Sequence, residues 1–170
     1  MNEVHEAIRE MVAWERGVPH RIQHFLKVHS FCRYIGMEEG LDEATLRRLE
    51  LAAVVHDIGI HAAEAKYGNS NGKYQEELGL APARDLLTAQ GFSPEDIERV
   101  CYLVGHHHTY KNIDGIDYQI LVEADFLVNF FEDNISKTGI EHALTHVFKT
   151  ETGKRLCREM FLEEYRIVRP

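Results

Sequence analysis

Helical periodicity runs through almost the whole sequence, and residues that begin or end helices interrupt it at short intervals. No segment shows the alternation of β-branched and polar residues that is typical of a strand. Glycines and capping residues predict helices over residues 3–16, 19–39, 43–58, 74–90, 93–107 and 118–132, with one or two more ending near Tyr165. The pattern therefore predicts an all-α protein, a bundle of six to eight helices.

The chain shows no repeat, low-complexity stretch or linker. We therefore expect one domain over residues 1–170, with its core at about 19–133 and C-terminal helices over 139–165 packed on it. The segment from His61 to Lys73 contains Tyr67-Gly68-Asn69-Ser70-Asn71-Gly72, which is typical of turns, and is expected to be a mobile loop.

Charge and composition exclude several classes of protein. With 19 basic and 28 acidic residues the net charge is −9, which opposes binding to polymeric nucleic acid, because that affinity comes from Lys and Arg. No apolar run approaches the roughly 20 residues of a membrane span, and residues 1–10 lack the pattern of a secretory signal. We expect a soluble, cytoplasmic protein without membrane partners, and the sequence is compatible with a homo-oligomer.

Three widely spaced cysteines, without a Cys-x-x-Cys pair, indicate neither a disulfide framework nor a zinc ribbon. Cys32, Cys101 and Cys157 are expected to be small buried hydrophobic residues.

Ionisable residues fall on the apolar faces of three predicted helices. They are His24, His56, Asp57 and Asp125. A buried carboxylate costs several kcal/mol unless a cation or strong donors compensate it. Taken singly, each residue has an ordinary interpretation, a packed histidine that donates to a carbonyl or, for Asp125, a salt bridge between helices. Together, two imidazoles and two carboxylates suit a divalent ion with room for water and substrate.

These elements resemble the HD-domain metal-dependent phosphohydrolases. The resemblance is carried by Arg21-Ile22-Gln23-His24, by the run from Ala52 through His56-Asp57 to Gly59, and by Glu123-Ala124-Asp125-Phe126-Leu127. It implies that His24, His56, Asp57 and Asp125 ligate one divalent metal ion, whether Mn, Fe, Co, Ni, Zn or Mg. It also implies that metal-activated water hydrolyses a phosphate ester, of a nucleotide or another small phosphorylated metabolite, with Asp57 as a catalytic residue.

Three consecutive histidines, His106, His107 and His108, end the helix predicted over 93–107. The helical spacing favours an inward position for His107 and flanking positions for the other two. Related proteins use a histidine here for a second metal or for the substrate phosphate, so the resemblance implies such a role, with His107 as a catalytic candidate. The alternative is a polar helix end with histidines near its negative pole.

Other residues are candidates for substrate binding. They are Arg21, His61, Lys66 and Gln75. Lys66 flanks the Gly/Asn loop, which could close on an anion as a lid; the alternative is an ordinary solvated loop. The sequence departs from related proteins at Ile60, where the usual general acid is missing, and at Gln75, which replaces a histidine of two-metal relatives. A second metal is therefore expected to bind weakly or not at all.

Two other functions remain open from the sequence. One is a dinuclear iron oxygenase on the same scaffold, against which the missing ligand at Gln75 argues. The other is a non-catalytic module that senses nucleotides, against which the intact set of four metal ligands argues.

Overall fold

The computed structural model describes residues 3–164, all of whose regular elements are helical. The elements are α1 (Glu3–Trp14), α2 (Pro19–Glu38), α3 (Glu43–Val55), α4 (Ile60–Tyr67), α5 (Gly72–Ala89), α6 (Pro94–Val104), α7 (Ile116–Glu132), α8 (Lys137–His146), α9 (Glu151–Cys157) and a π-helical turn (Arg158–Leu162). In this part of the chain eight helices have eight or more residues, and α9 has seven. The predicted all-α class is confirmed; the predicted end near Tyr165 lies outside the described residues.

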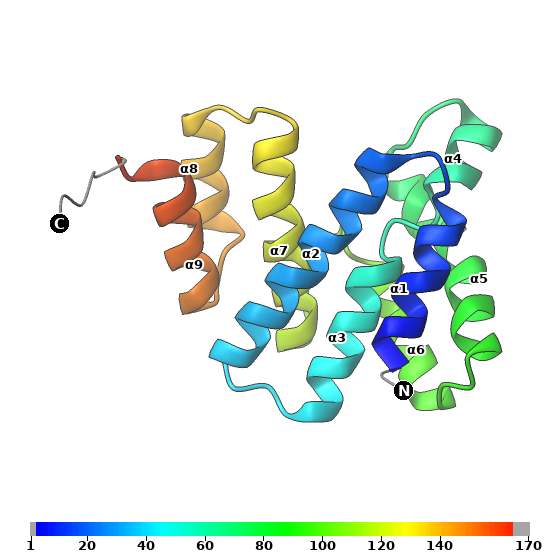
Figure 1. Cartoon of the computed structure of the whole chain (residues 1–170). Helices are drawn as coiled ribbons and strands as arrows, with labels where there is room; N and C mark the ends of the chain where they lie inside the picture. Colours follow the sequence, from blue (N-terminus) through cyan, green and yellow to red (C-terminus); the bar gives the residue numbers. More distant parts are fainter. Residues whose placement is uncertain (1–2, 165–170) are drawn as a thin grey trace, which may run out of the picture.

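Helices α2 and α3 pack against each other in the middle of the molecule, and both contact α7. In Figure 1, α7, α8 and α9 lie to one side of this pair, and α1, α4, α5 and α6 lie to the other. The apolar stripe of α2 faces inward as the sequence predicts, with Phe25, Val28, Cys32 and Ile35 buried. His24 lies beside this stripe and is therefore carried into the interior.

Helix starts follow the predicted capping residues. The Asp42 carboxylate accepts a hydrogen bond from the Thr45 amide at the start of α3, and the Ser93 hydroxyl accepts one from the Asp96 amide at the start of α6. The three cysteines are buried and free, as expected. None of the described helices is long and apolar enough to cross a membrane.

The segment predicted as a mobile loop is largely helical, which corrects the prediction. Residues 60–67 form α4, and only 68–71 form the turn before α5. The run Ile60-His61-Ala62-Ala63 is followed by further helix formers, so a new helix begins directly after the turn over residues 56–59. Gly68 ends α4 with φ +70°, a left-handed conformation that glycine adopts without strain.

Two predicted helices end earlier than expected, at the positions where the ionisable residues begin. Helix α3 ends at Val55, so His56 and Asp57 lie in a turn that leads to α4. Helix α6 ends at Val104 instead of near position 107, and residues 105–108 form a turn. Side chains on such turns can point in directions that a continuous helix would not allow.

Gly59 allows the turn over residues 56–59 to pack closely against α5. A Cβ atom at Gly59 would lie 2.5 Å from the Gln75 carbonyl oxygen and 2.7 Å from the Gly79 amide nitrogen. The absence of a side chain therefore lets α3, the turn and α5 approach closely, and it holds Gln75 near the turn that carries Asp57.

Candidate metal centre

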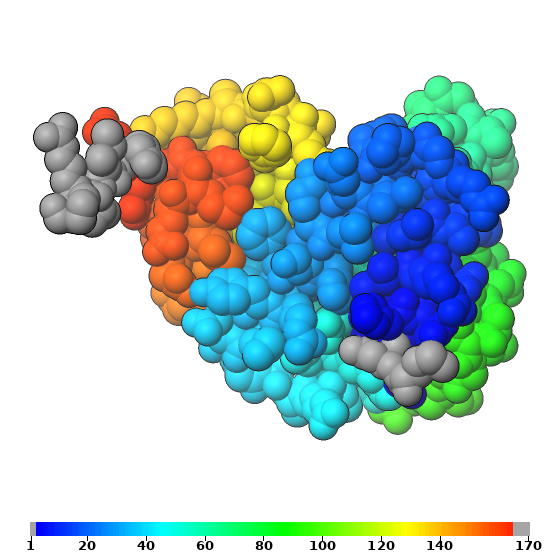
Figure 2. Space-filling view, viewed as in Figure 1, coloured from blue at the N-terminus to red at the C-terminus, as the bar shows by residue number. Residues whose placement is uncertain are grey.

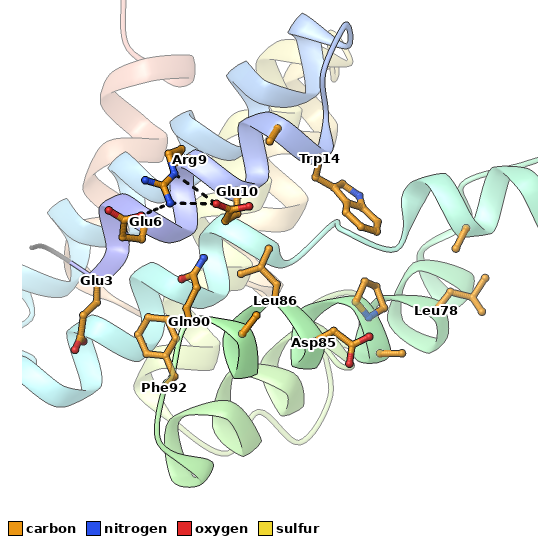
Figure 3. A pocket seen from close by; sticks show the side chains of 15 residues that line it. Glu3, Glu6, Arg9, Glu10, Trp14, Leu78, Asp85, Leu86, Gln90 and Phe92 are labelled. Carbon is orange, nitrogen blue, oxygen red and sulfur yellow. Dashed lines mark hydrogen bonds and ion pairs between the residues drawn. The ribbon is translucent and has the colours of Figure 1, made fainter.

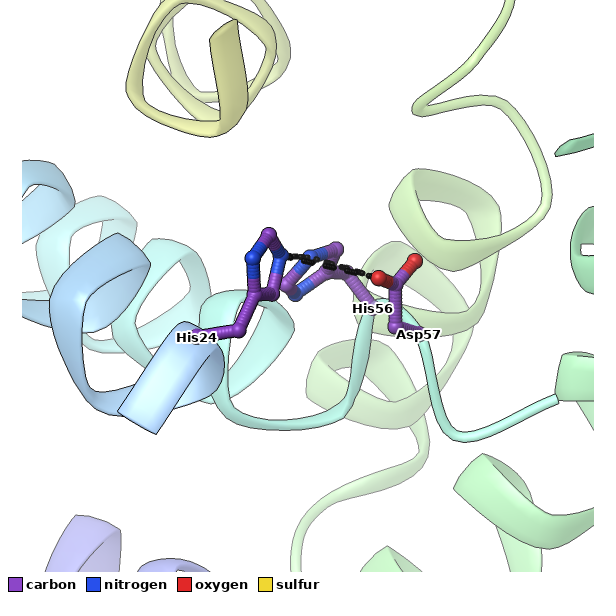
Figure 4. A group of neighbouring side chains, drawn as sticks. All are labelled: His24, His56 and Asp57. Carbon is purple, nitrogen blue, oxygen red and sulfur yellow. Dashed lines mark hydrogen bonds and ion pairs between the residues drawn. The ribbon is translucent and has the colours of Figure 1, made fainter. Parts of the chain in front are cut away.

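Helix α2, the turn after α3 and helix α7 bring His24, His56, Asp57 and Asp125 together. His24 Nε2 lies 3.2 Å from His56 Nε2, 3.3 Å from Asp125 Oδ1 and 3.6 Å from Asp57 Oδ2. His56 Nε2 lies 3.5 Å from Asp57 Oδ2 and 3.7 Å from Asp125 Oδ1. Figure 4 shows the side chains of His24, His56 and Asp57 converging. The structure thus gathers the four residues that the sequence singled out.

These four side chains are buried. Within residues 3–164, neither Asp57 nor Asp125 forms an ion pair with a lysine or an arginine. The interhelical salt bridge that would explain a buried Asp125 is therefore not found there. A buried carboxylate pair without basic partners needs protonated imidazoles or a bound cation.

Hydrogen bonds at the far side of each ring orient the imidazoles. The Nδ1–H of His24 donates to Glu132 Oε2 at 2.8 Å, and the Nδ1–H of His56 donates to the Ala53 carbonyl oxygen at 2.9 Å. Each neutral ring then presents an unprotonated Nε2 to its partner ring and to the carboxylates. Metal-binding histidines are held in this way, with one nitrogen donating to the protein and the other free for the ion.

The same arrangement keeps both carboxylates ionised. Burial raises the pKa of Asp57, but the charge of His56 and the hydrogen bond from His107 outweigh it and hold this pKa well below its usual range. Burial lowers the pKa of His24, but the hydrogen bond and charges of Asp125 and Asp57 outweigh it and raise this pKa to about 9. In the protein alone, imidazolium groups balance the carboxylates; a divalent cation would take over that role.

A second group of possible ligands shares Asp57. His107 Nε2 lies 3.0 Å from Asp57 Oδ1, and its Nδ1–H donates to the Val104 carbonyl oxygen at 2.8 Å. His108 Nε2 lies 3.8 Å from the same Asp57 oxygen. Among the described residues, two groups could hold a metal ion. One is His24, His56 and Asp57, with Asp125 beside them, and the other is Asp57, His107 and His108.

Gln75 lies behind the second group. Its Oε1 is 3.3 Å from His108 Nε2, and its side-chain amide donates to the Ser70 carbonyl oxygen at 2.6 Å. Gln75 thus connects His108 to the turn before α5. An amide oxygen is a weaker metal ligand than an imidazole for most transition metals, which fits a weaker second ion.

Comparison with protein families identifies the chain. The HD domain model matches residues 21–129, which include all four central residues. The protein belongs to the HD-domain family. A crystal structure of a predicted HD superfamily hydrolase from an uncultured Thermotogales bacterium aligns with a TM-score of 0.62 and 25% identity, over 94% of this chain and 83% of that chain. Among curated proteins none matches the sequence.

The centre of this HD domain opens into a cavity of about 320 Å³ between α2, α4 and the end of α7. In Figure 2 the outline of the molecule is indented between the start of α2 and the end of α7. His24 and Asp57 line this mouth cavity, together with Arg21, Glu64 and Glu132. A small molecule in the mouth cavity would therefore meet the metal centre directly.

Arg21, predicted to bind substrate, lines the mouth cavity, but carboxylates already surround its guanidinium. Its Nη2 donates to Glu64 Oε1 at 2.5 Å, and its Nη1 lies 3.7 Å from Glu15 Oε2. His61 belongs to the same cluster, because its Nε2 is 2.8 Å from Glu15 Oε2. Arg21 can reach an anion in the mouth cavity only by weakening these pairs.

Two further predicted residues lie away from the centre. Lys66 extends along α4, with its ammonium 4.8 Å from the Tyr67 ring centre and 3.9 Å from Glu77 Oε1, and it does not line the mouth cavity. His106 donates from Nδ1 to the Tyr102 carbonyl oxygen at 2.7 Å, and the two rings stack with centres 4.2 Å apart. The turn after Val104 rotates His106 away from its two neighbours, which corrects its inclusion among the candidate ligands.

Sequence reasoning missed two residues that support the centre. The Asn129 side-chain amide donates to Asp125 Oδ1 at 2.9 Å, and Glu132 holds His24. Both lie on the same face of α7 as Asp125, four and seven residues later. This spacing of polar residues along a buried helix face was the signal that could have found them.

A cavity larger than the mouth cavity lies elsewhere, between α1 and α5. It has a volume of about 1,090 Å³ and contains none of the residues of the centre. Figure 3 shows Glu6, Arg9 and Glu10 on one wall and Leu86 and Gln90 on the other. Volume alone would therefore point to the wrong part of this molecule.

Proposed function

We propose that this HD-domain protein is a metal-dependent hydrolase that cleaves a phosphate ester of a nucleotide or another small phosphorylated metabolite. The observation that carries the proposal is the buried cluster of His24, His56, Asp57 and Asp125, which borders an open cavity and whose carboxylates pair with no lysine or arginine within residues 3–164. The name of the Thermotogales protein, a predicted HD superfamily hydrolase, supports the reaction class.

The donor set fits a divalent ion. His24 and His56 each offer Nε2 once a metal ion displaces its proton, and Asp57 and Asp125 each offer a carboxylate oxygen, with 3.2–3.7 Å between the atoms of the contacts described. When bound, such an ion polarises a phosphoryl oxygen and makes water a stronger nucleophile at neutral pH. The donors suit Mn, Fe, Co, Ni, Zn or Mg.

The protein's own groups would prepare the reaction in three ways. Glu132 and Asn129 hold His24 and Asp125 in position. His107 is buried behind Asp57 and orients its carboxylate through the contact between His107 Nε2 and Asp57 Oδ1. His108, with its side chain 22% exposed, lies nearer to solvent and can donate to a substrate oxygen.

The test is hydrolysis by wild type and by Asp57→Ala. Purified protein is incubated with nucleotides and other phosphate esters in the presence of Mn²⁺, Co²⁺, Fe²⁺ or Mg²⁺. We expect turnover by wild type, and a loss of at least about 100-fold in Asp57→Ala with an unchanged circular dichroism spectrum. Asp85→Ala, a change on the distant helix α5, is the matched control and keeps full activity.

Turnover by Asp57→Ala at the wild-type rate would contradict the proposal. Nucleotide binding without turnover in any metal would instead favour a sensing module.

The second group of histidines favours one other reaction class. Asp57, His107 and His108 could hold a second iron, as a dinuclear oxygenase requires. Oxygen consumption that depends on Fe²⁺ and on an organic substrate would support this function, and hydrolysis with Mg²⁺ alone would contradict it.

A further inference from the structure

Another cavity, of about 400 Å³, lies between α7, α8 and the loop before α7. It shares the lining residue Asn129 with the mouth cavity. Its walls are aromatic, with Tyr110, Phe126 and Phe130 as the largest residues. A volume of this size is within the range of small-molecule sites. We call it the aromatic cavity.

Asn129 connects the two cavities, because it lines both of them. Its side-chain amide also donates to Asp125 Oδ1 at 2.9 Å. A molecule that reached from the metal centre into the aromatic cavity would therefore pass along Asn129, whose amide oxygen is available to accept a hydrogen bond from it.

The two cavities offer opposite chemistry. The lining of the mouth cavity includes five charged residues beside Phe25, Ile60 and neutral polar residues; the charged ones are Arg21, Asp57, Glu64, Glu132 and Asp133. Among the described residues, the lining of the aromatic cavity includes no aspartate, glutamate, lysine or arginine. The pair of cavities therefore suits a molecule with one charged end and one apolar end.

Aromatic surface in this cavity is left uncovered by the protein. The Tyr110 and Phe126 rings meet edge to face, with centres 5.0 Å apart and planes at 66°. Tyr110 is nevertheless 45% exposed, and Ile135 is 40% exposed. A flat apolar group could cover these side chains and gain the contacts that aromatic pairs favour.

The loop that carries Tyr110 is held by hydrogen bonds, so the wall is preformed. The Tyr118 hydroxyl lies 2.6 Å from the His106 carbonyl oxygen and also contacts the Thr109 carbonyl oxygen. Glu76 Oε1 accepts a hydrogen bond from the His108 amide at 2.9 Å. The same anchors thus position His108 at the metal centre and Tyr110 at the aromatic cavity.

We infer that the aromatic cavity is a subsite for a flat aromatic group of the substrate, such as a nucleobase, while the phosphate lies at the metal centre. The inference rests on the proposed hydrolase function, which it makes more specific. It excludes small polyol phosphates as the best substrates, because they would leave the subsite empty.

The first test measures binding without catalysis. Saturation-transfer NMR with adenosine, in the presence of Mg²⁺, compares the protons of the base with those of the ribose. In wild type we expect at least about twofold more saturation on the base protons than on the ribose protons. In Tyr110→Ala and in the cavity-filling variant Ala143→Leu, the saturation of the base protons should fall about 3–10-fold. Tyr34→Ala, which removes a tyrosine of similar exposure (42%) from α2, is the matched control and changes nothing.

The second test compares adenosine 5′-monophosphate with ribose 5-phosphate, which differ by the base. We expect kcat/KM for the nucleotide to fall about 3–10-fold in Tyr110→Ala, while that for ribose 5-phosphate stays unchanged. Equal saturation of base and ribose, or saturation unaffected by both cavity variants, would overturn the subsite. Absence of hydrolysis together with base-selective saturation would overturn the proposed function and leave the subsite standing.

Discussion

His107 directs its Nε2 atom at Oδ1 of Asp57 from a distance of 3.0 Å. The other oxygen of that carboxylate, Oδ2, lies 3.5 Å from His56 Nε2. Asp57 is therefore shared between two groups of imidazoles, and a charge bound at one group changes the electrostatics of the other.

The shared carboxylate predicts one tight and one weaker metal ion. Calorimetric titration with Mn²⁺ should show a second ion that binds at least about 10-fold more weakly than the first. The reason is that Gln75 offers only an amide oxygen beside His108. His108→Ala should abolish the second binding event and leave the first. Gln75→His, which adds an imidazole, should strengthen the second event by about 10-fold or more. Two equally tight ions in wild type would contradict this prediction.

Glu132 is predicted to act on metal affinity through His24, whose Nδ1–H it accepts. Glu132→Ala should lower the affinity for the first ion by about 10–100-fold. Glu132→Gln should have a smaller effect, since its amide oxygen can still accept the hydrogen bond. The measurement is competition with a chelating dye. Glu77→Ala on the exposed face of α5 serves as the control, and an unchanged affinity in Glu132→Ala would show that His24 needs no such support.

Gly59→Ala should destabilise the fold through steric overlap alone, because the new Cβ would meet the backbone of α5 at Gln75 and Gly79. We expect the free energy of unfolding in urea to fall by about 1–3 kcal/mol, with metal affinity reduced as well. In Gly139→Ala, at the start of α8, the new Cβ would contact only side-chain atoms. The free energy of unfolding of this variant should therefore stay within about 1 kcal/mol of the wild-type value. Equal free energies of unfolding for the two variants would mean that α5 can move away from residue 59 without loss of stability.

Acid should weaken the contact between α3 and α6 at Asp96. This carboxylate accepts hydrogen bonds from Arg47 Nη2 and Arg48 Nε, each at 2.7 Å. Burial raises the pKa of Asp96, but the hydrogen bond from Arg48 outweighs it, so the pKa is lower in the folded protein than in the unfolded chain. The stabilisation is therefore present above the unfolded pKa and is lost as the pH falls through the lower folded pKa.

Asp96→Asn tests this contribution. At pH 7 it should cost about 1–3 kcal/mol of unfolding free energy, and the difference from wild type should shrink as the pH falls below about 4. Glu95→Gln removes a neighbouring exposed partner of Arg48 and should cost less than about 1 kcal/mol. A difference between Asp96→Asn and wild type that stays constant down to pH 2 would rule out the ionised carboxylate as its source.

Residue patterns alone determined much about this protein. Helical periodicity and capping residues determined the all-α class, and the burial of His24, His56, Asp57 and Asp125 could be predicted from their places on apolar faces. Periodicity works for His24 and Asp125 because a helix places residues three and four apart on one face, whereas His56 and Asp57 lie in the turn that directly follows α3. Periodicity also contained the signal for Asn129 and Glu132, which lie on the same face of α7 as Asp125.

Tertiary structure decided what periodicity cannot describe. The directions of His106, His107 and His108 depend on a turn that begins at Gly105, where the helical spacing no longer applies. The pairing of Arg21 with Glu15 and Glu64 joins residues from three separate segments. Whether Asp57 serves one group of histidines or two, and whether an aromatic cavity adjoins it, depends on how the helices cross, and no local pattern of residues encodes those distances.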